Sequence, residues 1–415
     1  MNRLDRTVLQ MNKLRQWLNP WFGGDRLFFI SYGTLLAASV LSTSFYYRYF
    51  DVRPFYAVQI LCVGLLVVFE WMTGGVEKRH WPAFGFCLFF AVIGVMRAEG
   101  NLTRLVGLIF PYVFCARKIP FPKIADISLK VTFITVAFIV FSGYLGVIDN
   151  VVAHRSGRLR EYLGFRYSLY APGIVLNMTA LYIYIRKSRI TIPAAIFWAL
   201  LNWYVYHMTD SRISFVLAEL LIVIAVLMRF MPKIVEKVQA LWAVMAASFA
   251  IFVVGSLLMT IFYDSTNPWM RRLNTALEGR LNLGRKSLSQ YGIPLFGKDI
   301  EWIGNGLDVD GNTVEGIYNY VDCLYVKVLQ WYGLVFTVLL MVLLCWAMFR
   351  LWRQKEYHIL LISASVAAHC VLDDLSFSLH YNTFWIAMGV ALLAPSMLRW
   401  DGRTNQFPPP EPPTQ

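Results

Sequence analysis

Charged residues are scarce in this chain, and their scarcity decides its class. Asp, Glu, Lys and Arg make up 15% of the 415 residues, whereas hydrophobic residues make up 58% and the mean hydropathy is +0.53. A soluble domain typically has about 25% charged residues, so a soluble globular protein is excluded. The net charge of +13 does not indicate nucleic-acid binding, because the basic residues lie in short segments between apolar runs.

Cysteine and histidine are also few, with six of each. The cysteines lie in or beside apolar runs and show no paired spacing, so we expect neither a disulfide framework nor a thiolate metal site. The histidines lack the spacing of metal ligands. No internal repeat is visible. The sequence therefore predicts no metal site and no cofactor.

Long apolar runs are abundant. A helix needs about 20 mainly apolar residues to cross a bilayer, and lipid offers no partners for an open backbone. We therefore predict an all-α polytopic membrane protein with about twelve transmembrane helices. The predicted spans are 27–46, 55–71, 81–96, 105–115, 131–147, 169–185, 190–206, 213–228, 238–262, 324–349, 359–372 and 383–398. The fourth is short and contains Pro111, so a re-entrant segment is the alternative there.

Basic residues fall on alternate sides of these spans. If the N-terminus is cytoplasmic, every inner segment is basic, as the positive-inside bias requires. This divides the chain into a basic N-terminal segment (1–26), a transmembrane bundle (27–398) and a Pro-rich tail (399–415). Both termini are then expected in the cytoplasm.

Two predicted outer loops, 148–168 and 264–321, break this bias because they are rich in cations. The first contains Arg155, Arg158, Arg160 and Arg166, and the second contains Arg280, Arg285 and Lys286. Guanidinium groups bind phosphate oxygens bidentately and stay charged, so these residues are candidate ligands of a pyrophosphate. Attraction to lipid headgroups is the alternative.

Arg212 closes the run Asp210-Ser211-Arg212 at the outer end of the seventh span. It is a further candidate for substrate binding, with a simple interfacial anchor as the alternative. In the second loop, apolar residues from Trp269 to Leu281 recur at helical spacing and predict a short amphipathic helix at the membrane interface.

Several titratable groups are expected at the same outer face. Asp322 begins the tenth span and follows Tyr320, Asp373 and Asp374 end the eleventh, and His380 precedes the twelfth. Such groups can deprotonate a hydroxyl or bind a sugar, although each could instead be a helix cap. We take Asp322 and His380 as the candidate catalytic residues and Tyr320 as a candidate substrate-binding residue.

Four short motifs stand out at the predicted outer face. They are Arg158-Leu-Arg160 with Leu163-Gly164-Phe165, Thr209-Asp210-Ser211-Arg212, Gly279-Arg280-Leu281-Asn282-Leu283-Gly284 with Pro294-Leu295-Phe296-Gly297, and Tyr320-Val321-Asp322 with Tyr332-Gly333-Leu334. These motifs resemble the Wzy family of polysaccharide polymerases, within the O-antigen polymerase and ligase superfamily. Cys323 departs from the family pattern, in which Asn is usual at that position.

The resemblance implies a GT-C-like membrane glycosyltransferase that uses no metal. It would join oligosaccharide repeat units carried on undecaprenyl pyrophosphate at the extracytoplasmic face of the bacterial cytoplasmic membrane, passing the growing chain of an exopolysaccharide, capsule or O-antigen to the incoming unit. Implied partners are the lipid-linked donor and acceptor, membrane lipids, and flippase and chain-length regulator proteins. The alternatives are an O-antigen ligase-like transferase and a twelve-span sugar or lipid transporter.

Overall fold

The computed structural model describes residues 13, 15–17, 23–50, 52–97, 104–155 and 158–399, without the side chains of residues 52, 104, 105, 155 and 158. The described chain is mainly helical, with a single two-stranded sheet. Its first half contains α2 (Arg26–Ser42), α3 (Tyr47–Phe50), α4 (Val52–Met72), α5 (Trp81–Met96), α6 (Arg104–Cys115), α7 (Phe121–Tyr144), β1 (Val152–Arg155), β2 (Arg158–Glu161), α8 (Tyr170–Arg186) and α9 (Ile192–Thr209). Its second half contains α10 (Arg212–Phe230), α11 (Pro232–Lys237), α12 (Gln239–Ala246), α13 (Ser248–Ile261), α14 (Pro268–Ala276), α15 (Arg280–Tyr291), α16 (Leu324–Trp331), α17 (Leu334–Arg353), α18 (Tyr357–His369) and α19 (Phe384–Leu393).

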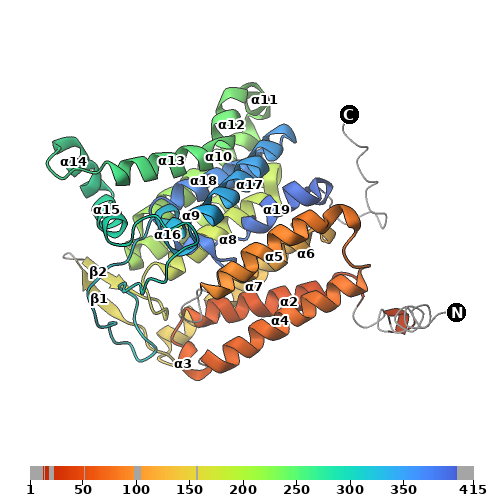
Figure 1. The fold of residues 1–415 in the computed structure, drawn as a ribbon, viewed down its shortest axis with the longest axis horizontal. Helices are drawn as coiled ribbons and strands as arrows, with labels where there is room; N and C mark the ends of the chain where they lie inside the picture. The colour runs from red at the N-terminus through yellow and green to blue at the C-terminus, as the bar shows by residue number, and fades with distance from the viewer. Residues whose placement is uncertain are drawn as a thin grey trace.

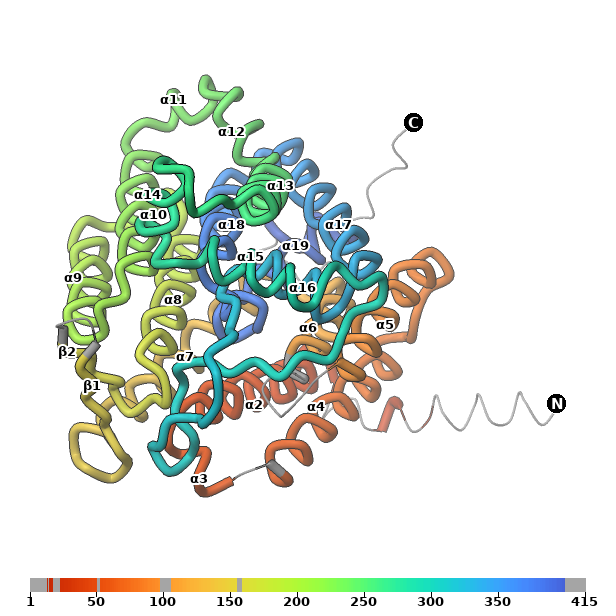
Figure 2. Tube along the Cα trace, turned by 60° about the vertical axis from the view of Figure 1, so that its left-hand side comes forward, coloured from red at the N-terminus to blue at the C-terminus, as the bar shows by residue number. Residues whose placement is uncertain are grey.

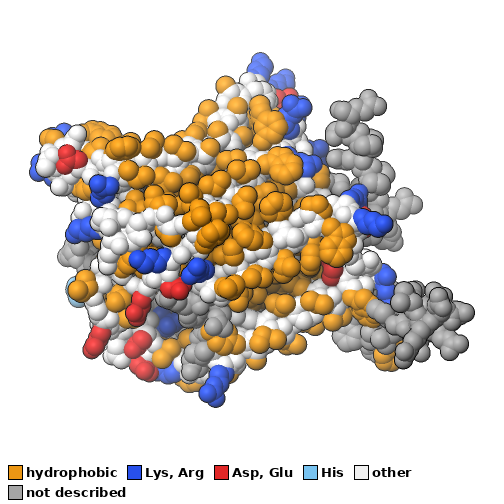
Figure 3. Space-filling view, in the orientation of Figure 1, with side chains coloured by type: hydrophobic (Ala, Val, Ile, Leu, Met, Phe, Trp, Pro, Cys, Tyr) orange, Lys and Arg blue, Asp and Glu red, His pale blue; other side chains and the backbone are white. Residues whose placement is uncertain are grey.

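The long helices lie side by side along the longest axis of the molecule (Figure 1). One end of this bundle carries α3, the β1–β2 hairpin, α14 and α15, and the opposite end carries α11 (Figure 1). We call the first the hairpin end. Hydrophobic side chains cover the middle of the visible surface, and charged side chains gather toward its two ends (Figure 3). An apolar middle between two charged ends suits a protein embedded in a bilayer.

Length and composition identify five helices that could cross a membrane. They are Arg53–Met72, Lys78–Met96, Phe121–Tyr144, Arg212–Phe230 and Leu334–Arg353, and the bent pair α12 and α13 would make a sixth. The all-α membrane class is thus confirmed, and each predicted apolar segment contains a helix. The number of long apolar helices is nevertheless five or six among the described residues, not twelve, because several predicted spans form shorter helices.

Two outer segments fold in ways that hydropathy did not predict. The first loop forms an antiparallel hairpin in which Val152 pairs with Glu161 and Arg155 with Arg158. In the second loop, the predicted amphipathic helix is two helices, because Glu278 (φ 53°) and Gly279 (φ 86°) adopt left-handed backbone between α14 and α15. Trp269 on α14 is 56% exposed, as a helix lying on an interface requires.

The predicted span 324–349 is also wrong as a single helix. It breaks between α16 and α17, where Gly333 has φ 94°. The outer loop fills this break: Lys298 N donates to Gln330 O over 2.9 Å, and Leu334 N donates to Pro294 O over 2.9 Å. These bonds satisfy backbone groups that a broken helix would leave without partners. Residues 294–298 are therefore part of the helix break and hold the outer loop against it.

Gly297 is the tightest point of this contact. Its φ of 86° disfavours a side chain, and a Cβ atom there would clash with the carbonyl oxygen of Trp331. We predict that Gly297→Ala destabilises the protein by at least ~1–2 kcal/mol from the left-handed backbone alone. A thermal unfolding scan in detergent would show this as a lower apparent Tm.

Gly255 provides the matched control, because it lies inside α13 with no atom within 4 Å of a Cβ position. Gly255→Ala should leave the apparent Tm unchanged or raise it, since alanine favours helix over glycine. Equal Tm values for the two variants would contradict the role given to Gly297.

Candidate functional site

Two cavities are lined mainly by residues from segments at the hairpin end. The arginine cavity has a volume of about 240 Å³. Its charged residues come from β2, the α9–α10 junction, the start of α15, the chain just before α16 and the chain just after α18. Those residues are Arg160, Asp210, Arg212, Glu278, Arg280, Asp322 and Asp373. The aromatic cavity has a volume of about 340 Å³ and is lined by Tyr170, Trp302, Tyr320, Trp331, Tyr332, Phe377 and Tyr381, with Lys327, Asp374 and His380.

Asp210 joins two of the predicted arginines. It ends α9 in a left-handed conformation (φ 53°), and this turn lets α10 begin two residues later at Arg212. An Nη of Arg160 donates to Asp210 Oδ2 over 3.2 Å, and Arg212 Nε lies 3.6 Å from Asp210 Oδ1. One largely buried carboxylate thus holds guanidinium groups that come from the hairpin and from the start of α10.

Arg280 enters the same cavity from the first residue of α15. This helix crosses the end of the bundle beside α13 and α16 (Figure 2). It packs closely because Gly284 faces Thr260, where a Cβ atom would come within 2.8 Å of the Thr260 methyl group. Ser287 then donates a buried hydrogen bond of 2.7 Å to Gln330 Oε1. These contacts fix the direction in which the Arg280 side chain leaves the helix.

The Arg280 side chain is only 10% exposed and lies between two carboxylates. Its Nε is 3.5 Å from Asp322 Oδ2, and one Nη is 3.4 Å from Glu278 Oε2. Burial works against its charge, but Asp322 and Glu278 outweigh burial and raise the pKa of Arg280. The Nε makes no hydrogen bond among the described residues. A buried N–H of this kind can donate to an anionic ligand.

Asp373 is a buried carboxyl group of the arginine cavity with a strongly raised pKa. Its Oδ1 accepts a hydrogen bond of 2.7 Å from Leu375 N, and its Oδ2 lies 4.0 Å from His369 Nε2, beyond hydrogen-bond distance. Burial, followed by the negative charge of Asp374, raises the pKa of Asp373 to about 8. A group that exchanges its proton near neutral pH suits general acid–base catalysis.

The cavity is balanced in charge rather than purely cationic. Sequence reasoning treated the two outer loops as clusters of cations, but the structure places Asp210 beside two arginines and Asp322 beside Arg280. The carboxylates hold the guanidinium groups in place and neutralise part of their charge. Positioned guanidinium groups then need little rearrangement when an anion binds.

The structure brings four of the predicted site residues together. Arg160, Arg212, Arg280 and Asp322 all line the arginine cavity. The side chains of Arg155 and Arg158 lie outside the described part of the structure.

Other predicted ligands point elsewhere. Arg166 donates to Ser42 O over 2.8 Å and lies 5.1 Å from the centre of the Tyr47 ring, so it ties the outer loop to α2 and α3. Arg285 and Lys286 are exposed on α15 and do not line the arginine cavity.

Tyr320 and His380 line the aromatic cavity, so the two candidate catalytic residues, Asp322 and His380, face different cavities. Burial lowers the pKa of His380 to about 3. Its imidazole is therefore neutral at physiological pH and a weak base, which argues against the catalytic role expected for it.

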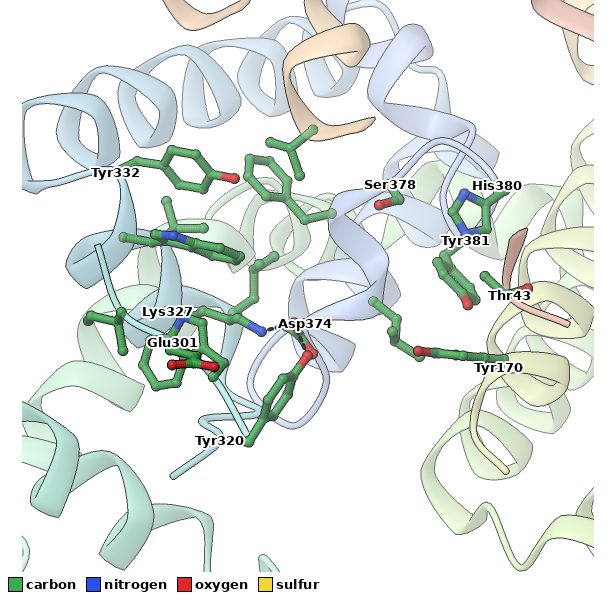
Figure 4. A pocket seen from close by; sticks show the side chains of 18 residues that line it. Thr43, Tyr170, Glu301, Tyr320, Lys327, Tyr332, Asp374, Ser378, His380 and Tyr381 are labelled. Atoms are coloured by element: carbon green, nitrogen blue, oxygen red, sulfur yellow. Dashed lines mark hydrogen bonds and ion pairs between the residues drawn. The ribbon is translucent and has the colours of Figure 1, made fainter. Parts of the chain in front are cut away.

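An ion pair on one wall organises the aromatic cavity. Lys327 Nζ donates to Asp374 Oδ2 over 2.6 Å, and the Tyr320 hydroxyl donates to the same oxygen over 2.8 Å (Figure 4). The ammonium group also lies 3.7 Å from the centre of the Tyr320 ring. Tyr170, His380 and Tyr381 lie across the cavity from this group (Figure 4).

The two cavities are separated by a shared wall. Neighbouring residues of the same chain segment line different cavities. Asp373 lines the arginine cavity and Asp374 the aromatic cavity, and Asp322 and Tyr320 divide in the same way. The sequence analysis identified these carboxylates as candidates, but it did not predict that they line two different cavities. It also missed Asp210 as the partner of both arginines, and it gave Trp302 and Trp331 no role in a site.

The raised pKa of Asp373 predicts a pH-dependent stability. The folded protein keeps this proton up to about pH 8, whereas an unfolded chain releases it near the ordinary value of 3.8. The stabilising contribution is therefore complete below pH 3.8 and is lost as pH rises toward 8. Because Asn does not titrate, the apparent Tm of the wild type should fall relative to that of Asp373→Asn between pH 5 and 8.5.

Thermal scans of both proteins in one detergent over this pH range would measure the difference. The exposed carboxylate Glu315 provides the control, and the Tm difference between wild type and Glu315→Gln should stay constant. A constant difference for Asp373→Asn as well would mean that Asp373 is an ordinary ionised carboxylate.

Comparisons with known protein families, with curated proteins and with solved structures found no match to this chain. No group of three or more His, Cys, Asp or Glu side chains able to hold a metal lies in the described part of the chain. Conclusions about function therefore depend on the geometry of the two cavities.

Proposed function

We propose that this protein is a membrane glycosyltransferase that joins oligosaccharide repeat units carried on undecaprenyl pyrophosphate. The observation that carries the proposal is the convergence of Arg160, Arg212 and Arg280, from three separated segments, on one cavity that also holds Asp322 and Asp373. The reaction belongs at the outer face of the bacterial cytoplasmic membrane. The twelve-span topology, with both termini cytoplasmic, and the GT-C-like architecture are parts of the same proposal.

The chemistry requires stabilisation of a leaving diphosphate. As the bond between the anomeric carbon and the diphosphate oxygen breaks, that oxygen keeps the electron pair and gains negative charge. Positioned guanidinium groups stabilise this charge, and removing one such donor typically costs about 2.7–4 kcal/mol in the transition state. Arg280 is best placed for this role, because its side chain is the most buried of the three arginines.

The accepting hydroxyl must lose a proton as it attacks the anomeric carbon. Asp373 can take this proton once it is ionised, and its pKa of about 8 makes it a stronger base than an ordinary carboxylate. A bound diphosphate would raise the pKa of Asp373 further, because like charges disfavour ionisation. The substrate would thereby make the ionised carboxylate a stronger base and lower the fraction of Asp373 that is ionised at neutral pH.

An apolar groove supports a lipid-linked substrate. It has a volume of about 290 Å³ and lies between α5, α6, α17 and α19, with Phe90, Leu340 and Trp385 among its lining residues. Phe377 lines both this groove and the aromatic cavity. An isoprenoid chain in the groove would therefore hold its polar head near the cavities.

Substitution of Arg280 tests the proposal. In the native strain lacking the gene, a plasmid copy with Arg280→Gln should lower the rate of polymer formation at least 100-fold, as loss of one such donor does in other enzymes. Long-chain polymer should disappear while lipid-linked single units accumulate, both seen by gel analysis and by mass spectrometry of the lipid fraction.

Arg285→Gln is the matched control, because Arg285 is exposed on the same helix. It should leave polymer length unchanged. Normal polymer from a well-expressed Arg280→Gln protein would show that the arginine cavity is not the catalytic site. A strain lacking the gene that stores long unattached chains instead of single units would identify a ligase-type transferase.

The proposed orientation can be tested by cysteine labelling. In a background without the six native cysteines, Lys286→Cys on α15 and Lys233→Cys on α11 place thiols at exposed positions at the two ends of the bundle. An impermeant maleimide should label position 286 in intact spheroplasts, and position 233 only after lysis. The reverse pattern would place the arginine cavity in the cytoplasm and end the proposal.

A further inference from the structure

The aromatic cavity has features that the diphosphate chemistry does not use. Its walls carry the rings of Tyr170, Trp302, Tyr320, Trp331, Tyr332 and Tyr381. Its volume of about 340 Å³ lies within the range of small-ligand sites, which are typically apolar with a few fixed polar groups.

Several polar atoms on these walls lack a partner. Trp331 Nε1 and Tyr332 Oη make no hydrogen bond among the described residues, although the two side chains are only 6% and 2% exposed. Trp302 Nε1 and His380 Nε2 are also buried atoms that make no hydrogen bond among the described residues. Leaving a buried polar atom without a partner costs roughly 1–3 kcal/mol, so four such atoms on side chains that line one cavity point to a ligand that bonds to them.

The charges of the cavity favour a ligand of low charge. Lys327 and Asp374 neutralise each other at 2.6 Å, and the Tyr320 hydroxyl occupies the same carboxylate oxygen. Glu301 is exposed on its wall. A phosphate would have to compete with Asp374 for Lys327, and a purely apolar ligand would leave the indole and phenol groups without partners.

We propose that the aromatic cavity binds a pyranose ring of the oligosaccharide. The flat faces of Trp and Tyr rings pack against the C–H face of a sugar, while indole N–H, phenol O–H and the Lys327–Asp374 pair bond its hydroxyl groups. This inference rests on the proposed transferase function and deepens it. The shared wall at Asp373 and Asp374 places the sugar beside the arginine cavity, where its diphosphate or its accepting hydroxyl would lie.

The experiment uses the oligosaccharide released by mild acid from lipid-linked units of the strain lacking the gene. Its binding to the purified full-length protein in detergent is measured by saturation-transfer NMR and titration. Tyr332→Phe and Trp331→Phe remove one polar atom each and keep an aromatic ring. Each should weaken binding about three- to tenfold, the loss expected for one hydrogen bond.

Trp203→Phe, at a 52% exposed position on α9, is the matched control and should bind like the wild type. If the oligosaccharide accumulates but does not bind, or binds equally to the Tyr332→Phe and Trp331→Phe proteins, the sugar site is overturned while the transferase proposal stands. If no lipid-linked oligosaccharide accumulates in the strain lacking the gene, the transferase proposal fails, and the sugar site fails with it.

Discussion

The ion pairing of buried arginines is the constraint on which the hairpin end depends. A guanidinium group in a largely dry cavity is tolerated only when carboxylates or hydrogen bonds compensate for its lost hydration. Arg280 meets this requirement with Asp322, and Arg160 meets it with Asp210. Because each pair joins residues far apart in the chain, pairing also draws α15, α16, the hairpin and the α9–α10 junction around one cavity.

The sequence predicted the parts of this site better than their arrangement. Each apolar segment that hydropathy located contains a helix, and the bias of basic residues assigned Arg160, Arg212, Arg280 and Asp322 to one face. It could not identify Asp210 as the residue that joins two arginines, because such a contact depends on the left-handed end of α9. Apolar composition cannot show where a helix ends or breaks, so only five or six of the described helices are long enough to cross a membrane, and the predicted span 324–349 divides at Gly333.

Arg280 and Arg285 show why a count of cations misleads. Two side chains five positions apart on an α-helix point in directions that differ by about 140°, since a turn contains 3.6 residues. One side chain can therefore face the cavity only if the other turns away from it. The observed exposures agree, with Arg280 at 10% and Arg285 exposed. Sequence reasoning gave both residues equal weight because the start of α15 was not known.

The shared wall couples the two cavities through neighbouring carboxylates. The charge on Asp374 contributes to the raised pKa of Asp373, and Lys327 and Tyr320 hold that charge by bonding to Asp374. A ligand that drew Lys327 away from Asp374 would leave the carboxylate less compensated and raise the pKa of Asp373, whereas a donor bonded to Asp374 would lower it. A sugar bound in the aromatic cavity, as proposed, would therefore change how readily Asp373 accepts a proton. In a transferase this means that the sugar in one cavity can control the base in the other.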